Sequence, residues 1–277
     1  VEQVVHVEAS WHHSKGKGVV EETQFIESLA FGVDTVKLGG IVATADPRDR
    51  NFKKILKLHH KASPHFRGIR KMASFHEDKA IHAWTDEPHL YRNKKFLKGF
   101  EVLSQYNLSF DAWVYSTQLE DVIYLAKQFP ETSIVLDHLG TPAGLFGPIG
   151  ANTGMTQTAR ENIFFRWKDD LAELASCPNV YTKMSGLFMP VLGHRFHKEG
   201  RLASKQEVFD LAHPMITHAL ACFGTYRVMF ASNFPMDSVS TSLINIIDAF
   251  SDVVAAYDPD ALERVFHHNA KQFYRLE

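Results

Sequence analysis

Short apolar runs alternate along the whole chain with longer segments whose apolar residues have helical spacing. The runs cover residues 4–7, 41–45, 66–72, 108–115, 133–140, 180–185 and 227–231, and the helical segments cover 21–30, 52–60, 96–106, 118–129, 159–176, 208–222, 241–256 and 260–274. Apolar runs of this kind are typical of strands in a parallel sheet covered by helices. The sequence therefore predicts an α/β protein, and about seven strands at this spacing favour a (β/α) barrel over an open sheet.

Composition excludes several classes of protein. The formal net charge is −2 and no basic stripe stands out, so we do not expect a nucleic-acid partner. No apolar run is long enough to cross a bilayer and no signal peptide is found, so we expect a cytoplasmic protein that binds no membrane. Cys177 and Cys222 lie far apart and form no CxxC, so neither a disulfide framework nor a zinc knuckle is implied.

Polar residues follow the apolar runs at the points where the predicted strands end. The run 133–140 ends in Asp137 and His138, and three other runs carry Arg67 and Arg70, Lys183 and Ser185, and Asn233 and Asp237. A lone charge at a strand end is more often a solvated rim residue. In a barrel, however, all these ends meet at one mouth, where ligands bind and where burying so many polar groups without partners is costly.

Strand alternation restricts which of these side chains share a face. Lys183 and Ser185 have the same parity, so both can point into a barrel, whereas Arg67 and Arg70 have opposite parity and only one can. Asp137 and His138 also oppose each other on a regular strand. The loop 140–154, which is rich in glycine, follows His138 directly and is predicted to act as a lid.

Seven motifs in order along the chain resemble the amidohydrolase-related family. They are VVHVEAS, GIVATADP, FRGIR, VLDHLG, VYTKMSG, MFASNFPMD and HNAKQFYRL, and they are most similar to the lactonase branch, which includes 2-pyrone-4,6-dicarboxylate lactonases and L-fuconolactonases. The resemblance implies a single domain over residues 1–277 with a distorted TIM (β/α)8 barrel. It also implies that His138 is catalytic, that Lys183 and Ser185 belong to the site, and that Arg67 and Arg70 bind substrate carboxylates.

Two departures from the family pattern affect these roles. The family's first strand ends in His-x-His, and this sequence has no such motif, so we expect that the first β/α unit is missing from this chain. Without those ligands no metal site is expected, although a divalent metal such as zinc would become plausible if His-x-His lay upstream. Asn233 stands where many relatives have an aspartate that acts as general base, and Asp237 is the residue that can replace it.

Three functions remain open at this point. The leading hypothesis is hydrolysis of a small cyclic ester or a related carboxylated ring: His138, with Lys183, stabilises the oxyanion, Asp237 activates water and Arg67 or Arg70 holds a carboxylate. Ser10, His12 and Trp113 are expected to shape the pocket. The alternatives are a metal-dependent amidohydrolase or non-redox decarboxylase of the same superfamily, and a barrel that binds a small molecule without turnover.

The expected gap in the barrel has a further consequence. It would leave unpaired strand edges beside residues 4–7 and 227–231, and such edges favour association. We therefore expect either poor solubility or a homodimer that covers the gap.

Overall fold

The fold is built on one parallel sheet. The structure, a computed structural model, describes residues 1–11 and 16–277. Within these residues seven strands pair in sequence order, each parallel to its neighbours. They are β1 (Gln3–Val7), β2 (Lys37–Thr44), β3 (Phe66–Met72), β4 (Ser109–Trp113), β5 (Ile134–Leu136), β6 (Val180–Met184) and β7 (Val228–Phe230). The predicted parallel α/β architecture is confirmed.

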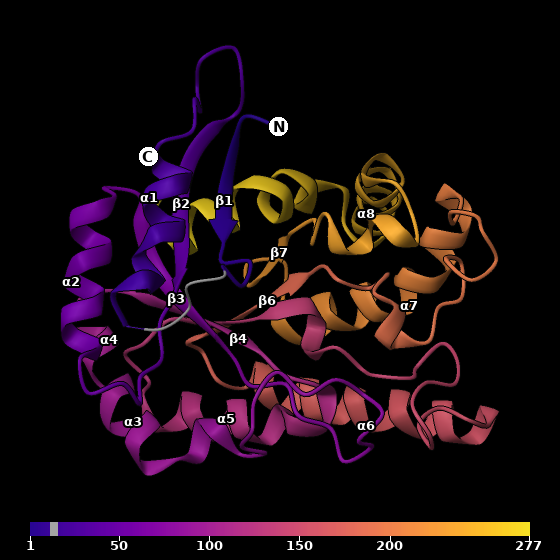
Figure 1. The fold of residues 1–277 in the computed structure, drawn as a ribbon. Coiled ribbons are helices and arrows are strands. Elements are labelled where there is room, and N and C mark those ends of the chain that lie inside the picture. Colours follow the sequence, from indigo (N-terminus) through magenta and orange to yellow (C-terminus); the bar gives the residue numbers. More distant parts are fainter. Residues whose placement is uncertain (12–15) are drawn as a thin grey trace.

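Helices follow the strands and lie around the outside of the sheet (Figure 1). They are α1 (Glu21–Glu27), α2 (Phe52–Ala62), α3 (Lys94–Phe100), α4 (Val102–Gln105), α5 (Leu119–Gln128), α6 (Gln157–Ala175), α7 (Lys205–Phe223), α8 (Leu243–Tyr257) and α9 (Asn269–Tyr274). Two predicted helices are divided in the structure. Segment 96–106 breaks at Glu101 between α3 and α4, and segment 260–274 begins with a 3-10 turn and a π-helical turn before α9.

The sheet curls so that its inner face encloses a second, smaller apolar layer. Outward-facing residues such as Ile69 and Phe110 pack in the main core that the helices cover. Inward-facing Val42, Val135 and Met229 come from β2, β5 and β7, yet they share one cluster. Burial on both faces explains why the strands are continuous apolar runs in the sequence.

Residues 273–276 cover this inner layer at the end of the sheet where the strands begin. Phe273 and Tyr274 are part of the inner cluster, and Leu276 packs against it. The guanidinium of Arg275 donates to the carbonyl oxygen of Arg67 at the start of β3, over 3.0 Å. The final residues therefore occupy the end of the sheet where the strands begin and leave the opposite end open for a site.

Strands β1 and β7 are the two ends of the strand order. Neither a further strand before β1 nor a homodimer is tested by the structure, and both stay predictions. Among the described residues, no helix combines the length and the apolar composition that a membrane span needs.

Replacing Phe273 by alanine should destabilise the fold strongly. Its ring is 4% exposed and packs against Tyr181 with ring centroids 4.9 Å apart, so its loss opens a cavity inside the sheet. We expect the free energy of unfolding in urea to fall by about 3–5 kcal/mol. The matched control is Phe165→Ala on α6, where the side chain is 61% exposed; equal losses in the two variants would contradict this assignment.

Candidate active site

A cluster of buried charges lies inside the sheet near the carboxyl ends of its strands. On β6, Lys183 places its Nζ 2.5 Å from Oδ2 of Asp111 on β4 and 2.8 Å from Oδ1 of Asp137, which follows β5. Arg70 on β3 donates from Nε to Glu8 at 2.8 Å and from Nη1 to Asp137 at 3.2 Å, and it also donates to the Glu8 carbonyl oxygen. The cluster therefore links segments that follow or form β1, β3, β4, β5 and β6.

Each charge in this cluster is held by its neighbours. Burial would raise the pKa of Asp137, but the charges of Lys183 and Arg70 outweigh burial and lower it. Burial would lower the pKa of Lys183, and Asp111 and Asp137 raise it instead. For Asp111 burial prevails, and its pKa is raised. Three carboxylates (Glu8, Asp111 and Asp137) face two cations, so the cluster has a formal charge of −1 when all are ionised.

The structure separates the two arginines that the sequence suggested as carboxylate ligands. Arg67 lies at the start of β3, and its Nη1 donates to the carbonyl oxygen of Pro64 at 2.7 Å, so it does not join the charge cluster. Arg70 points inward, as the parity argument allowed for one of the two, but Glu8 and Asp137 already occupy its guanidinium. Lys183 is likewise inside the sheet, and its Nζ is held by two carboxylates. Its predicted role at an oxyanion stays a prediction.

The chain turns sharply where β5 ends. Asp137–Gly140 forms a 3-10 turn in which His138 and Leu139 have φ values of 56° and 50°, in the left-handed region that non-glycine residues rarely adopt. The strand therefore stops at Leu136, and the expectation that Asp137 and His138 oppose each other across a regular strand does not apply. Gly186 lies against the imidazole, where a Cβ would come within 2.5 Å of the ring.

His138 is buried and fixed by Ser185. Its Nδ1 lies 2.8 Å from Oγ of Ser185, and Trp113 packs against its ring edge-on at a centroid distance of 5.8 Å. Burial, together with the charges of Arg70 and Lys183, lowers the pKa of His138 to about 4. The imidazole is therefore neutral at physiological pH. Over residues 1–11 and 16–277, its Nε2 has no hydrogen-bond partner.

A buried carboxyl group lies beyond β7. Asn233, with φ of 53°, donates from Nδ2 to Oδ1 of Asp237 at 2.8 Å. Asp237 is 1% exposed, and burial raises its pKa to about 7, although hydrogen bonds from Asn233 and from the backbone of Phe188 act in the opposite direction. A carboxyl group poised near neutrality can accept a proton at physiological pH.

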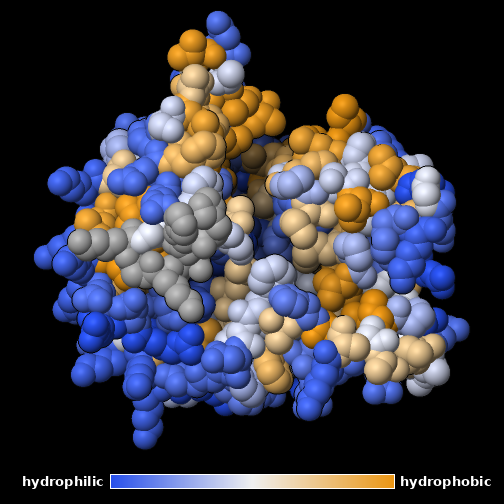
Figure 2. All heavy atoms as spheres, viewed as in Figure 1, coloured by the Kyte–Doolittle hydropathy of each residue, from blue (hydrophilic) through white to orange (hydrophobic). Residues whose placement is uncertain are grey.

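The segment that follows β6 brings these groups together. Ser185 binds His138, Gly186 packs on its ring, and the backbone of Phe188 reaches Asp237. Lys183, two residues earlier, holds Asp137, the chain neighbour of His138. The polar residues that the sequence placed at strand ends, with the exception of Arg67, therefore lie on or beside this segment and the charge cluster. Figure 2 shows a face that is hollowed near its centre, with hydrophilic side chains deep in the opening.

Of the three predicted pocket residues, the structure describes Ser10 and Trp113. Ser10 is exposed, and its backbone N–H donates to Glu8 at 3.1 Å. His12 lies outside the described residues. Trp113 does reach the site: its Nε1 donates to Oγ1 of Thr141 at 2.9 Å, which fixes the indole beside His138.

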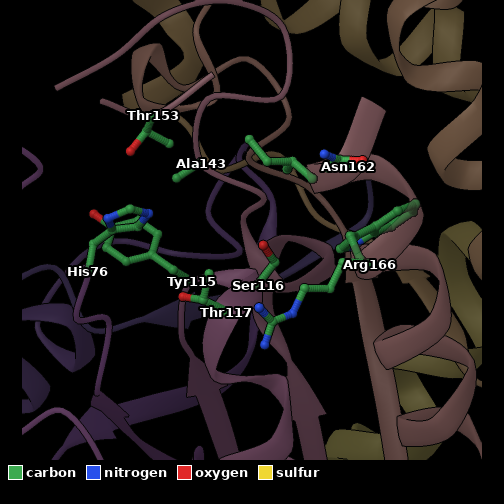
Figure 3. A pocket seen from close by; sticks show the side chains of 10 residues that line it. His76, Tyr115, Ser116, Thr117, Ala143, Thr153, Asn162 and Arg166 are labelled. Atoms are coloured by element: carbon green, nitrogen blue, oxygen red, sulfur yellow. The ribbon is translucent and has the colours of Figure 1, made fainter. Parts of the chain in front are cut away.

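The loop 140–154 is held in place by hydrogen bonds to Asp78. Oδ2 of Asp78 accepts from the backbone N–H groups of Ala151 and Asn152 at 2.8 and 2.7 Å. Beneath the loop is a separate cavity of about 220 Å³. Figure 3 shows His76 and Tyr115 on one side of this cavity and Asn162 and Arg166 on the other.

Three members of the charge cluster and its surroundings were missed from the sequence: Glu8, Asp111 and Tyr274. Asp111 carried a signal, since it is a carboxylate in the middle of the apolar run 108–115 with the same parity as Trp113. Tyr274 carried none, because its hydroxyl meets Oδ2 of Asp111 at 2.8 Å across 163 positions of sequence.

Comparisons with known proteins bear on the family and the fold of this chain. A family model described as Amidohydrolase matches residues 37–276. An uncharacterised protein of Sinorhizobium fredii is 32% identical over 86% of this chain and 70% of its own length. An L-fucono-1,5-lactonase of Burkholderia ambifaria is 28% identical over 77% of this chain, and the match spans 63% of that enzyme.

Solved structures share the fold at lower identity. An amidohydrolase from Burkholderia multivorans with bound zinc superposes with a TM-score of 0.75 at 20% identity, covering 99% of this chain and 83% of that one. A Pseudomonas putida protein described as a 2-pyrone-4,6-dicarboxylic acid hydrolase superposes with a TM-score of 0.63 at 16% identity, covering 99% of this chain and 82% of that one.

A catalytic zinc ion needs about three protein ligands. In the part of the chain that the structure describes, no group of three or more His, Cys, Asp or Glu side chains is arranged to hold a metal. Asp137, the carboxylate next to His138, is turned toward Arg70 and Lys183. The described residues by themselves therefore do not fit a catalytic metal.

Replacing Lys183 by methionine should destabilise the protein by about 3–5 kcal/mol, because it leaves two buried carboxylates without their cation. Adding Asp111→Asn should restore part of this loss. The free energy of unfolding in urea measures both effects. The control is Lys127→Met, which breaks an exposed pair with Glu173 and should cost less than about 1 kcal/mol; a similar small loss at Lys183 would contradict the cluster.

The Asp237 carboxyl group should make stability depend on pH. Its pKa in the folded protein lies above the ordinary value of 3.8, so its contribution is retained below about pH 4 and lost as the pH rises through 7. The loss amounts to at most about 4 kcal/mol. Asp237→Asn should remove this slope, and unfolding at pH 5 and pH 8.5 measures it. An equal difference between variant and wild type at both pH values would overturn the assignment.

Proposed function

Because the chain belongs to the amidohydrolase family, we propose that it hydrolyses the ring ester of a small uncharged lactone. The observation that carries this proposal is that one short segment, 185–188, holds both a buried neutral imidazole, through Ser185, and a buried carboxyl group whose pKa is near 7, through the backbone of Phe188. These two groups are what acyl transfer to water requires: a donor for the carbonyl oxygen and an acceptor for the proton of water.

His138 is the donor. If the hydroxyl of Ser185 donates to Nδ1, then Nε2 carries the imidazole proton and is free to donate to the carbonyl oxygen of the lactone. The low pKa of His138 keeps the ring neutral, so it serves as a hydrogen-bond donor that strengthens as negative charge develops on that oxygen. The left-handed turn and Gly186 hold the ring in place for this role.

Asp237 is the general base. Its ionised form accepts a proton from water while the water oxygen attacks the carbonyl carbon. The tetrahedral intermediate then collapses, the ring C–O bond breaks, and the proton held by Asp237 passes to the departing alkoxide. The product is a hydroxy acid, and both catalytic groups return to their starting states. Asn233 positions Asp237 through its hydrogen bond.

The charge cluster favours an uncharged substrate over a carboxylated ring. The charged groups that act on His138 are Asp137, Arg70 and Lys183, and each of the two cations is already paired with two carboxylates of the cluster. Described cations beside His138 are therefore not available for a substrate carboxylate. The names of the lactonases at 28% and 26% identity support six-membered aldonolactones such as L-fucono-1,5-lactone as the first substrates to assay.

Activity should depend on both groups and on pH. His138→Ala should lower kcat/KM for L-fucono-1,5-lactone by about 100- to 1000-fold, and Asp237→Asn should lower it by at least about 100-fold. For the wild type, kcat/KM should rise about tenfold per pH unit below 7 and level off above it, because only the ionised Asp237 accepts a proton. A pH-stat assay at constant ionic strength measures both.

The matched control is Arg67→Ala, since Arg67 lies at the start of β3 and should leave kcat/KM within about twofold of the wild-type value. Unchanged rates in His138→Ala and Asp237→Asn would refute the catalytic assignment. Binding of lactones without turnover by the wild type would favour a non-catalytic binding barrel.

A further inference from the structure

A row of aromatic rings extends from His138 toward the surface. Trp113 packs against His138 at a centroid distance of 5.8 Å, and Trp84 packs against Trp113 at 5.3 Å. His82 lies beyond, 4.7 Å from Trp84 and edge-on to it. The exposed fraction rises along the row, from 6% for His138 and 8% for Trp113 to 38% for Trp84.

The segment that carries Trp84 is fixed to the sheet. The backbone N–H of Trp84 donates to the carbonyl oxygen of Ser74 at 2.8 Å, and the hydroxyl of Tyr115 donates to the carbonyl oxygen of His82, also at 2.8 Å. Ser74 is itself tied to β4, since its hydroxyl donates to the carbonyl oxygen of Trp113 at 3.1 Å. The Trp84 ring is therefore held beside Trp113, and its exposure is not that of a loose loop tip.

We propose that Trp84 and Trp113 form an aromatic wall on which the ring of the substrate lies while its carbonyl group reaches His138. This inference rests on the proposed function and assigns a specificity residue, Trp84, that touches the substrate away from the reacting atoms. The wall selects substrates that present an apolar face of C–H groups, as a saturated six-membered lactone does.

The chemistry of the wall agrees with an uncharged ring. The indole N–H of Trp113 is already used by Thr141 and Trp113 is 8% exposed, so the indole of Trp84, 38% exposed, supplies most of the apolar surface that the wall offers to a ligand. Aromatic surfaces bind C–H faces through apolar burial and the negative charge of their π faces, and that same negative charge disfavours a carboxylate. The aromatic row therefore favours an uncharged substrate, as the charge cluster beside His138 does.

Kinetics of Trp84 variants test the wall. Trp84→Ala should raise KM for L-fucono-1,5-lactone about tenfold and leave kcat within about twofold, because the indole supports the ring and not the reaction. Trp84→Phe should restore most of the loss. Phe165→Ala, which removes an exposed aromatic ring on α6, should change neither constant. A fall in kcat with unchanged KM, or no change in either, would overturn the proposal.

A binding experiment separates this proposal from the proposed function. The matching six-membered lactam has the same ring but resists hydrolysis, and isothermal titration gives its Kd whether or not the protein turns over lactones. Binding to the wild type with about tenfold weaker binding to Trp84→Ala supports the wall even if hydrolysis fails. Equal affinity in both proteins, or no binding to the wild type, would sink it.

Discussion

The fold and the site both depend on one buried arrangement of charges. Lys183 lies between Asp111 and Asp137, and Arg70 lies between Asp137 and Glu8, so one network of ion pairs joins segments of five of the seven strands or the residues that follow them. Removing either cation leaves buried carboxylates without their partner, which is far more costly than the loss of a surface pair. The network therefore fixes the positions of the strand ends from which His138 and Ser185 project.

The same network explains why the charged side chains near His138 are not free to bind a ligand. Arg70 and Lys183, for which the sequence suggests roles at the substrate, are here paired with carboxylates of the protein. The two groups proposed for catalysis are the neutral imidazole of His138 and the carboxyl group of Asp237, whose pKa is about 7. Both owe their state to burial: it disfavours the charged form of each, which lowers the pKa of the base His138 and raises that of the acid Asp237. Burial therefore gives His138 the neutral form of a hydrogen-bond donor and Asp237 the pKa of a base that works near neutral pH.

Much of this architecture could be predicted from the sequence. Buried strands leave continuous apolar runs, so the sequence locates all seven strands. The parity of Lys183 and Ser185 allows both to point inward, and both are buried, Lys183 in the charge cluster and Ser185 against His138. The turn at His138 could not be predicted, because a left-handed conformation at a non-glycine residue depends on the packing of Gly186 and Ser185. The partners of Arg70 also escaped prediction. An arginine at a strand end looks the same in sequence whether it meets a ligand or Glu8 and Asp137.

Tyr274, the last residue of α9, lies in the interior of the sheet. Its hydroxyl meets Asp111 from 163 positions away, so on the ribosome the inner carboxylates are made long before their final hydrogen-bond donor emerges. A nascent chain that stops before Tyr274 cannot complete this polar interior, however well its strands have already paired. Folding of the inner layer is for this reason tied to synthesis of Tyr274, and a product terminated before it would present a defect that cellular proteases can recognise.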